Sequence, residues 1–267
     1  MTDPSALLAA YDEYTRARIP LNAPAGLTFE WDGPLLRTVG QHRGFVETTA
    51  DPRVRGAELD ALIARQREYF AARGEAVEWK TRGHDKPDDL VDRLLAAGFV
   101  PEERETVLIG EAAELAAEPV LPAGVTLRQV FDPKDLERIA AMHGEIWGLD
   151  QDWLAADLAG RIAAEPETFA VFAAEAEADA GPLTVCAAWI TLKEGTEFAG
   201  LWGGSTLEAW RGKGIYRATV ARRAQLAVAH DVKYLQVDAS DDSRPILQRL
   251  GLHAVTTTTP YVWTPAA

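Results

Sequence analysis

The chain has a single cysteine, Cys186, among its 267 residues. One thiol can form no intramolecular disulfide and cannot build a cysteine-based metal site. Basic residues are also few, because 27 lysines and arginines face 41 aspartates and glutamates, for a net charge of −14. A nucleic-acid surface usually needs a basic face, so we expect neither DNA nor RNA as a partner. The acidic balance is compatible with a cationic substrate such as an amine, and equally with an acidic surface that serves solubility alone.

Long apolar runs and a leader segment are missing as well. No apolar run approaches the roughly 18 residues that a membrane-spanning helix needs. The N-terminus lacks the basic and apolar segments of a signal peptide. We therefore expect a cytoplasmic protein without a membrane partner. With 47% hydrophobic and 25% charged residues, the composition is that of a packed globular protein, and the length allows two domains.

The second half of the chain predicts a strand, two helices and a three-stranded meander. The first helix begins at an Asp-Pro pair, which is typical of a helix N-terminus. The three β-rich runs are separated by turn-forming residues, which indicates antiparallel pairing. In chain order we expect a strand at 125–130, helices from 132 and over about 152–164, and strands at 168–174, 183–192 and 198–207.

A glycine-bearing loop, Arg211-Gly212-Lys213-Gly214-Ile215-Tyr216, follows the third run and precedes a helix that extends to about residue 230. The amides at a helix N-terminus lack intrahelical partners, and the helix dipole places partial positive charge there. Glycines let a backbone approach a phosphate closely. The loop therefore predicts an anion site. It is neither a Walker-type phosphate loop nor a dinucleotide fingerprint, since it lacks both glycine patterns. After the helix we expect a strand at 233–238, a short helix ending at 251, and β-rich residues 253–263.

The first half of the chain repeats the later part of this order. Its segment 53–58 occupies the place of the glycine loop, and the spacing from that loop to the next strand is nearly the same in both halves. This indicates a duplication joined by an Ala- and Glu-rich linker at 111–122, although two α/β units with coincidental spacing remain an alternative. The expected elements are strands at 27–31, 35–39, 45–49 and 77–81, a helix over about 59–72, and a short helix ending at 98.

Residues 124–265 resemble the GNAT (Gcn5-related N-acetyltransferase) superfamily over the whole domain. The resemblance is carried by the element order, by the glycine loop at 211–214, and by the segment Ile246-Leu247-Gln248-Arg249-Leu250-Gly251-Leu252. It implies an α/β (α+β) fold with two GNAT-like domains, each a mixed, mostly antiparallel sheet flanked by helices. We place a degenerate domain at 1–117 and an acetyltransferase domain at 124–267.

The resemblance also implies a reaction and its residues. Acetyl-CoA would be the co-substrate, with no metal, and an amine of a small molecule or a protein would attack its acetyl group directly. The strands on either side of the loop helix would splay apart to admit the thioester. Ser240 or Asp241 falls where the family often has Asn, and either would bond the pantetheine or the backbone. Pyrophosphate would be bound by Arg211, Gly212, Lys213, Gly214, Ile215 and Tyr216, and the pantetheine amides by the backbone of Gly204, Ser205 and Thr206.

Several residues depart from the family pattern. Tyr216 stands where the family has Gly or Ala, and we expect its side chain to point away from the phosphates because only its amide is needed. Leu247 stands where many members have a tyrosine that protonates the departing thiolate. The general base is Asp238 or Glu197, unless both are solvated carboxylates at strand ends.

In the first half, Glu58 takes the place of Tyr216, and a carboxylate beside a pyrophosphate is repulsive. We therefore expect no CoA site there. The alternative for the whole chain is a non-catalytic acyl-CoA-binding or regulatory module. We expect a monomer or a homodimer.

Overall fold

The computed structural model describes residues 3–21, 26–148, 150–178 and 181–266. Contacts divide the chain into two compact units. The first contains residues 1–108, 238–245 and 253–267, and the second contains residues 109–237 and 246–252. The chain therefore enters each unit more than once. No helix in these described ranges is long and apolar enough to cross a lipid bilayer.

The last strand, β12 (His253–Trp263), shows why the compact units differ from halves of the sequence. Residues 258–263 of β12 pair antiparallel with β4 (Val77–Arg82), so the end of the chain completes the sheet of the first unit. The predicted domain limits 1–117 and 124–267 divide the chain by the order of its elements rather than by contacts. They stay a prediction of where the two duplicated halves lie.

The first unit contains a mixed sheet with the strand order β1-β2-β3-β4-β12, and β5 also pairs with β12. β3 and β4 are parallel, and the other pairs described in this unit are antiparallel. Its elements are α1 (Pro4–Thr15), β1 (Thr28–Asp32), β2 (Leu35–Val39), β3 (Gly44–Thr48), α2 (Gly56–Arg73), β4, α3 (Leu90–Ala96), β5 (Val100–Pro101), the start of β6 (Glu105–Glu111) and β12.

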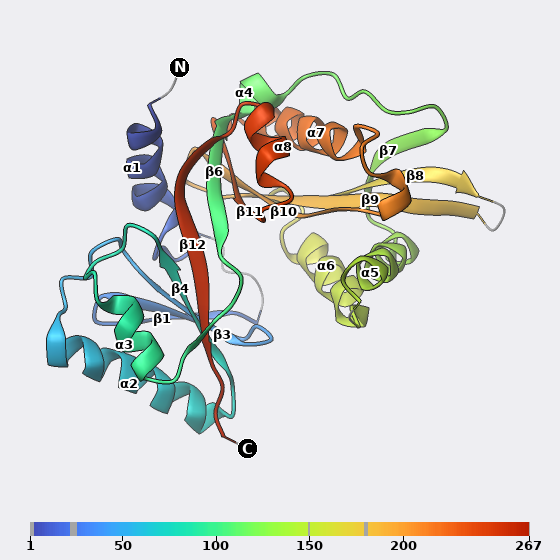
Figure 1. The fold of residues 1–267 in the computed structure, drawn as a ribbon. Coiled ribbons are helices and arrows are strands. Elements are labelled where there is room, and N and C mark those ends of the chain that lie inside the picture. Colours follow the sequence, from blue (N-terminus) through green and yellow to red (C-terminus); the bar gives the residue numbers. More distant parts are fainter. Residues whose placement is uncertain (1–2, 22–25, 149, 179–180, 267) are drawn as a thin grey trace. The chain divides into compact units, whose positions relative to one another are not determined.

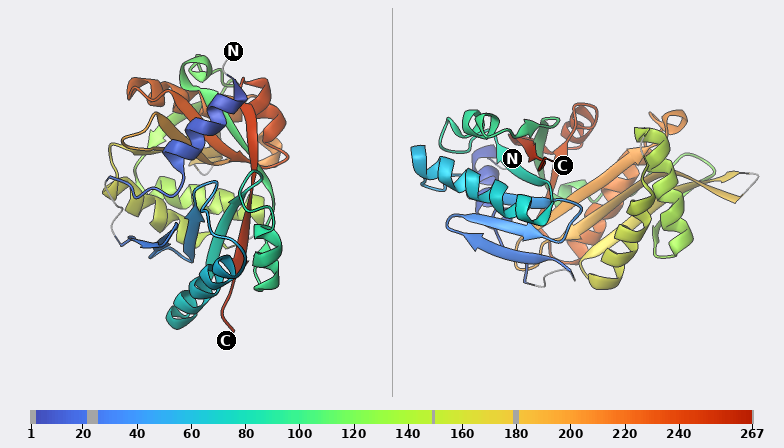
Figure 2. Two further views of the ribbon diagram at one scale, coloured as in Figure 1. Left: turned by 90° about the vertical axis from the view of Figure 1, so that its left-hand side faces the viewer. Right: turned by 90° about the horizontal axis from the view of Figure 1, so that it is seen from below.

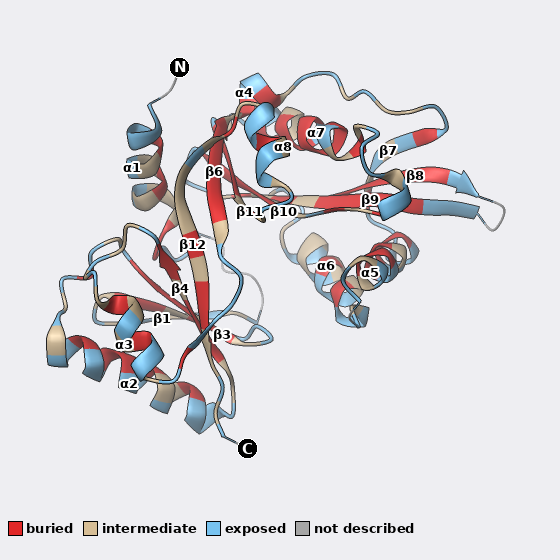
Figure 3. Cartoon of the chain, viewed as in Figure 1, coloured by how far each residue is buried: buried red, intermediate tan, exposed pale blue. Residues whose placement is uncertain are grey.

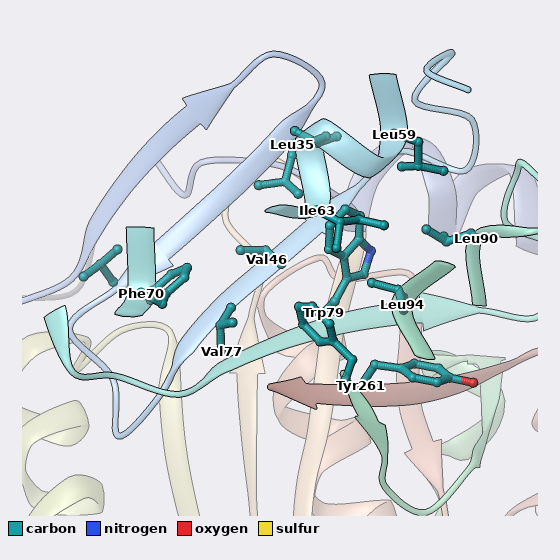
Figure 4. Packing of buried hydrophobic residues seen from close by; sticks show 13 residues of the cluster. Leu35, Val46, Leu59, Ile63, Phe70, Val77, Trp79, Leu90, Leu94 and Tyr261 are labelled. Carbon is teal, nitrogen blue, oxygen red and sulfur yellow. The ribbon is translucent and has the colours of Figure 1, made fainter. Parts of the chain in front are cut away.

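The core of the first unit lies between α2 and α3 and one face of this sheet (Figure 4). Trp79 on β4 is its largest fully buried side chain. Gly44 lacks a side chain because the ring of Phe70 from α2 occupies the space that a Cβ would need. The cluster consists of Leu35, Val39, Val46, Leu59, Leu62, Ile63, Phe70, Val77, Trp79, Leu90, Leu94, Phe99 and Tyr261.

Helix α1 brings a buried polar network to the first unit. Arg16, which follows the helix, donates to the carbonyl of Thr48 (3.0 Å) and pairs with Asp85 (2.7 Å). The hydroxyl of Tyr11 accepts from Arg82 (3.0 Å). The carboxylate of Glu47 pairs with Arg82 (3.2 Å) and accepts from the amide of residue 17 (2.7 Å). These partners close the space beyond the last paired residues of β3 and β4.

The second unit contains strands in the order β11-β10-β9-β8-β7. β10 and β11 are parallel, and the other pairs described in this unit are antiparallel. Its elements are the end of β6, α4 (Ala112–Leu115), β7 (Val125–Val130), α5 (Pro133–Trp147), α6 (Asp152–Ala164), β8 (Phe169–Ala178), β9 (Gly181–Leu192), β10 (Phe198–Thr206), a 3-10 turn (Glu208–Trp210), α7 (Ile215–Ala229), β11 (Tyr234–Ala239) and the end of α8 (Arg244–Arg249).

Helices cover both faces of the β8–β10 sheet. α5 and α6 pack on one face and α7 on the other (Figures 1 and 2). The middle of β8 and β9 is therefore buried, while the far ends of these two strands are exposed (Figure 3). Val171, Phe172 and Ala188 are among the residues almost completely hidden from solvent. The buried parts of β8 and β9 are continuous apolar runs because they are covered on both faces.

The predicted fold class is confirmed, because each unit has a mixed, mostly antiparallel sheet flanked by helices. Within the predicted linker at 111–122, residues 112–115 form the short helix α4. Helix α1 was not predicted, although Asp3 caps it and Pro4 opens it, and its buried residues are Leu7 and Tyr11. The turn-forming residues that the sequence places between the strands at 168–174 and 183–192 include 179–180, which lie outside the described ranges.

A second polar cluster of the first unit is formed by Lys80, Asp238 and Glu105. The ammonium of Lys80 pairs with the carboxylate of Asp238 at 2.7 Å, and both side chains are largely buried. Burial raises the pKa of Glu105 to about 7, and the negative charge of Asp238 adds to this effect while Lys80 opposes it. Glu105 is therefore a carboxyl group that titrates near neutrality.

Glu105 should make stability depend on pH. Between its ordinary pKa of 4.5 and its folded pKa of about 7, the folded state binds more protons than the unfolded state. The free energy of unfolding should therefore fall as the pH rises through this range. Glu105→Gln removes the titration and should raise the free energy of unfolding at pH 8 by about 1–2 kcal/mol relative to wild type, as measured by urea denaturation. Exposed Glu68→Gln on α2 is the control, because Glu68 is not among the charges that act on Glu105. Parallel pH curves for wild type and Glu105→Gln would contradict the assignment.

Candidate functional site

The glycine loop turns the chain from β10 into α7. Gly212 (φ +74°) and Gly214 (φ +82°) both adopt left-handed backbone conformations, which residues with side chains rarely adopt. A Cβ on Gly212 would meet no described heavy atom within 4 Å, so this side of the loop is open. The glycines are thus needed for the path of the backbone rather than for tight packing.

The start of α7 presents free backbone donors. The amide of Ala218 donates to the carbonyl of Gly214 (3.0 Å), which is the first bond of the helix. The amides of Ile215, Tyr216 and Arg217 precede this bond and have no intrahelical acceptor. No acidic residue lies in the first turn of α7, so nothing in the helix opposes an anion at its N-terminus.

The two basic side chains of the loop are exposed and keep their charge at its surface. Nε of Arg211 donates to the carbonyl of Thr206 (3.1 Å), which ties the loop to the end of β10. Nζ of Lys213 lies 4.4 Å from the ring centroid of Trp210. Both predicted residues therefore lie at the loop, where they provide positive charge and also fix its shape.

β10 and β11 separate, as the sequence predicts. Their parallel pairing covers residues 198–200 against 234–236, and β10 then continues to Thr206 while paired to β9 alone. Gly204, Ser205 and Thr206 lie on this separated segment of β10. The segment therefore presents a free strand edge next to the glycine loop.

A β-bulge interrupts β10 within the separated segment. The pairing with β9 shifts register between Trp202 and Ser205, and Gly203 has a positive φ of +59°. The indole of Trp189 occupies the space that a Cβ on Gly203 would need. Bulges of this kind re-aim the backbone and are common near functional sites.

Two buried side chains hold the bulge from opposite faces of the sheet. From α7, Nη1 of Arg223 donates to the carbonyls of Trp189 (3.2 Å) and Trp202 (3.4 Å). From α5, His143 hydrogen-bonds with the backbone of Gly203. Burial lowers the pKa of His143 to about 4, so the imidazole is neutral at physiological pH. The backbone groups that the bulge removes from the ladder are thereby satisfied.

Tyr216 points its side chain toward β10. Its ring lies 2.6 Å from the position that a Cβ on Gly204 would take, so the ring fits only because residue 204 is glycine. The positive charge of Arg223 lowers the pKa of the hydroxyl group, against the larger effect of burial, which raises it. The ring is therefore directed toward the sheet, whereas the amide stays at the helix N-terminus with the other loop donors.

The remaining predicted residues lie outside the glycine loop and outside the separated segment of β10. Asp238 lies on the separated end of β11, belongs to the first unit and pairs with Lys80. Burial lowers the pKa of Lys80, but the negative charge and the hydrogen bond of Asp238 together outweigh burial, so the pKa of Lys80 is raised overall. Glu197 is exposed, and its carbonyl accepts from the amide of Tyr234 (2.8 Å) at the paired end of β10 and β11. Ser240 accepts from the amide of residue 243 (3.4 Å), so it bonds the backbone of the turn before α8.

The sequence did not single out the two side chains that hold the bulge. Arg223 lies in a helix segment with a second arginine and gave no sign of burial. His143 shares a helix face with Leu136, Ile139 and Ala140, and this apolar face was the available signal. Within the described ranges, no group of His, Cys, Asp and Glu side chains is arranged to hold a metal ion.

The fold has close structural relatives, although no family model and no curated protein matches the chain. A GCN5-related N-acetyltransferase from Kribbella flavida has a TM-score of 0.66 at 18% identity, covering 100% of this chain and 97% of that one. A tandem GNAT protein from the clavulanic acid biosynthesis pathway has a TM-score of 0.62 at 13% identity, covering 99% and 94%. A Staphylococcus epidermidis protein of unknown function has a TM-score of 0.67 at 11% identity, covering 96% and 98%. The chain therefore has the GNAT fold, as the sequence predicts.

The bulge geometry predicts a large effect of one methyl group. Gly203→Ala forces a side chain into a left-handed conformation and against the Trp189 ring, so it should lower the free energy of unfolding by about 2–4 kcal/mol. Gly160→Ala, inside α6 and in open space, is the control and should be neutral or stabilising by up to about 1 kcal/mol. Denaturant unfolding monitored by circular dichroism measures both, and equal stability of the two variants would contradict the assigned bulge.

Proposed function

We propose that the second half of the chain is an acetyl-CoA-dependent N-acetyltransferase. The observation that carries this proposal is the open, glycine-shaped helix N-terminus of α7 next to the separated segment of β10. A helix N-terminus with free amides and no acidic residue suits a pyrophosphate. A free strand edge suits the amides of an extended chain such as pantetheine.

Each loop residue has a place in this proposal. The amides of residues 212–216 hold the pyrophosphate, and Arg211 and Lys213 add positive charge. The backbone of Gly204, Ser205 and Thr206 pairs with pantetheine. Acetyl-CoA supplies an activated acetyl thioester, and the chain binds and orients it so that an amine can attack. Asp238, on the strand that separates from β10, is the candidate base, whereas Glu197 lies at the closed end of the strand pair.

In the first half, by contrast, a carboxylate of the chain itself is bound by the loop that corresponds to the glycine loop. The carboxylate of Asp51 accepts from the amide of Arg53 (2.8 Å) and from the side chain of Arg55 (2.8 Å). The space beyond the paired residues of β3 and β4 is filled by Arg16 and its partners. We infer one CoA site per chain, in the second half.

A non-catalytic acyl-CoA-binding module is the second candidate. Two observations favour it, since the completely buried Leu247 cannot donate a proton and Asp238 is paired with Lys80. The acceptor would be an amine of a small molecule or a protein in the first case, and no acceptor would be needed in the second. Release of free CoA in the presence of a panel of amines separates the two candidates.

The pyrophosphate assignment is tested by a pair of variants at Gly212. Asp and Asn tolerate the left-handed conformation best among residues with a side chain, and they differ here mainly in charge. Gly212→Asp should weaken acetyl-CoA binding at least about ten-fold, because its carboxylate repels the pyrophosphate. Gly212→Asn should stay within about three-fold of wild type, as measured by isothermal titration calorimetry. Equal affinities of the Asp and Asn variants would show that the anion binds elsewhere.

The assignment of one site to the second half gives a separate prediction. Calorimetric titration with acetyl-CoA should yield one site per chain. Asp51→Asn should leave this stoichiometry and the affinity unchanged, because the space beside the first-half loop stays filled by α1 and its partners. A second site in wild type, or a loss of binding in Asp51→Asn, would place the cofactor in the first half.

A further inference from the structure

The proposed reaction lacks an acid at Leu247. This side chain is apolar and completely buried, so it cannot protonate a departing thiolate. The loop meanwhile contains a tyrosine, Tyr216, at a position where only a backbone amide is needed for phosphate. The structure relates these two departures from the family pattern.

The phenol of Tyr216 lies beside the strand segment that we assign to pantetheine. Its ring and its hydroxyl lie 2.6 and 3.4 Å from the position of a Cβ on Gly204. Gly204 adjoins the β10 bulge and lies two residues, about 7 Å, before Thr206. An extended pantetheine that starts at the glycine loop and follows β10 past Thr206 therefore brings its sulfur toward this hydroxyl.

The surroundings of Tyr216 suit a proton donor. Burial raises the pKa of Tyr216, and the positive charge of Arg223 lowers it without cancelling this effect, so the phenol is protonated at neutral pH and its O–H can donate.

Arg223 adds positive charge at the same place. It is 1% exposed, and its hydrogen bonds among the described residues go to neutral acceptors, the carbonyls of Thr219, Trp189 and Trp202, while its Nη2 has no hydrogen-bond partner there. A buried cation without a carboxylate partner favours negative charge that develops nearby.

We propose that Tyr216, beside the buried charge of Arg223, is the acid that protonates the thiolate of CoA as it leaves. This inference rests on the acetyltransferase function proposed above. The amine nitrogen forms a bond to the acetyl carbon, the carbon–sulfur bond breaks, and the sulfur takes the Tyr216 proton. The amine nitrogen loses one proton to its base and, through it, to solvent. The phenolate, beside the Arg223 charge, takes up one proton from solvent, so the protons balance. The products are the amide and the free thiol.

The test measures the ionisation of CoA bound to the protein, without turnover. The rate of alkylation of CoA by iodoacetamide, followed against pH with the protein in excess, reports the thiolate fraction. The only cysteine of the chain, Cys186, is completely buried. A hydrogen bond from Tyr216 favours the thiolate, so CoA bound to wild type should have a thiol pKa at least about one unit below that of free CoA. Tyr216→Phe should raise it by a similar amount while changing CoA affinity less than about three-fold.

Turnover gives the second readout. Tyr216→Phe should lower kcat for acetyl transfer at least about 100-fold with KM for acetyl-CoA nearly unchanged. Tyr234→Phe, a matched loss of a phenol on β11 in the same unit, should change neither value. An unchanged thiol pKa and an unchanged kcat in Tyr216→Phe would overturn the acid assignment. Failure of wild type to bind CoA would instead refute the proposed function, so the two failures are distinguishable.

Discussion

The buried guanidinium of Arg223 holds the interruption of β10 on which the candidate site depends. A strand that leaves its ladder exposes backbone carbonyls, and carbonyls buried without partners destabilise a fold. Arg223 donates hydrogen bonds to the carbonyls of Trp189 and Trp202, and His143 hydrogen-bonds with the backbone of Gly203 from the other face of the sheet. Because these groups are satisfied inside the sheet, the strand can keep its bulge where β10 has parted from β11.

The two halves of the chain show the same layout with opposite outcomes. In both, a parallel strand pair separates after three paired residues, next to a loop that begins a helix. In the first unit, α1 and Arg16 fill the space beyond the paired residues of β3 and β4. The carboxylate of Asp51 accepts from the loop amide of residue 53, where the loop would otherwise bind an anion. In the second unit, the corresponding loop has glycines, free amides and exposed basic side chains. The difference lies in the side chains, and it makes the second half the proposed site of acetyl-CoA.

Local patterns in the sequence were sufficient for the loop and for most of the element order, although α1, β5 and β6 were not predicted. Gly212 and Gly214 have the positive φ angles that a glycine loop implies, and β10 and β11 part where the family resemblance places the thioester. Contacts between residues distant in sequence could not be predicted this way. The pairing of Lys80 with Asp238 joins two strands 158 positions apart, and the burial of Arg223 depends on a bulge that no spacing rule shows. Helix α1 was missed because only two of its residues are buried.

The central claim, that one anion-binding helix N-terminus beside one free strand edge forms the cofactor site, is tested most directly by amide hydrogen exchange. Exchange should be followed residue by residue by NMR, with and without acetyl-CoA. The account predicts slower exchange at residues 212–217 and 204–206 on adding acetyl-CoA, and no change at residues 53–58. Protection of residues 53–58, or unchanged exchange at 212–217 in protein saturated with acetyl-CoA, would contradict it.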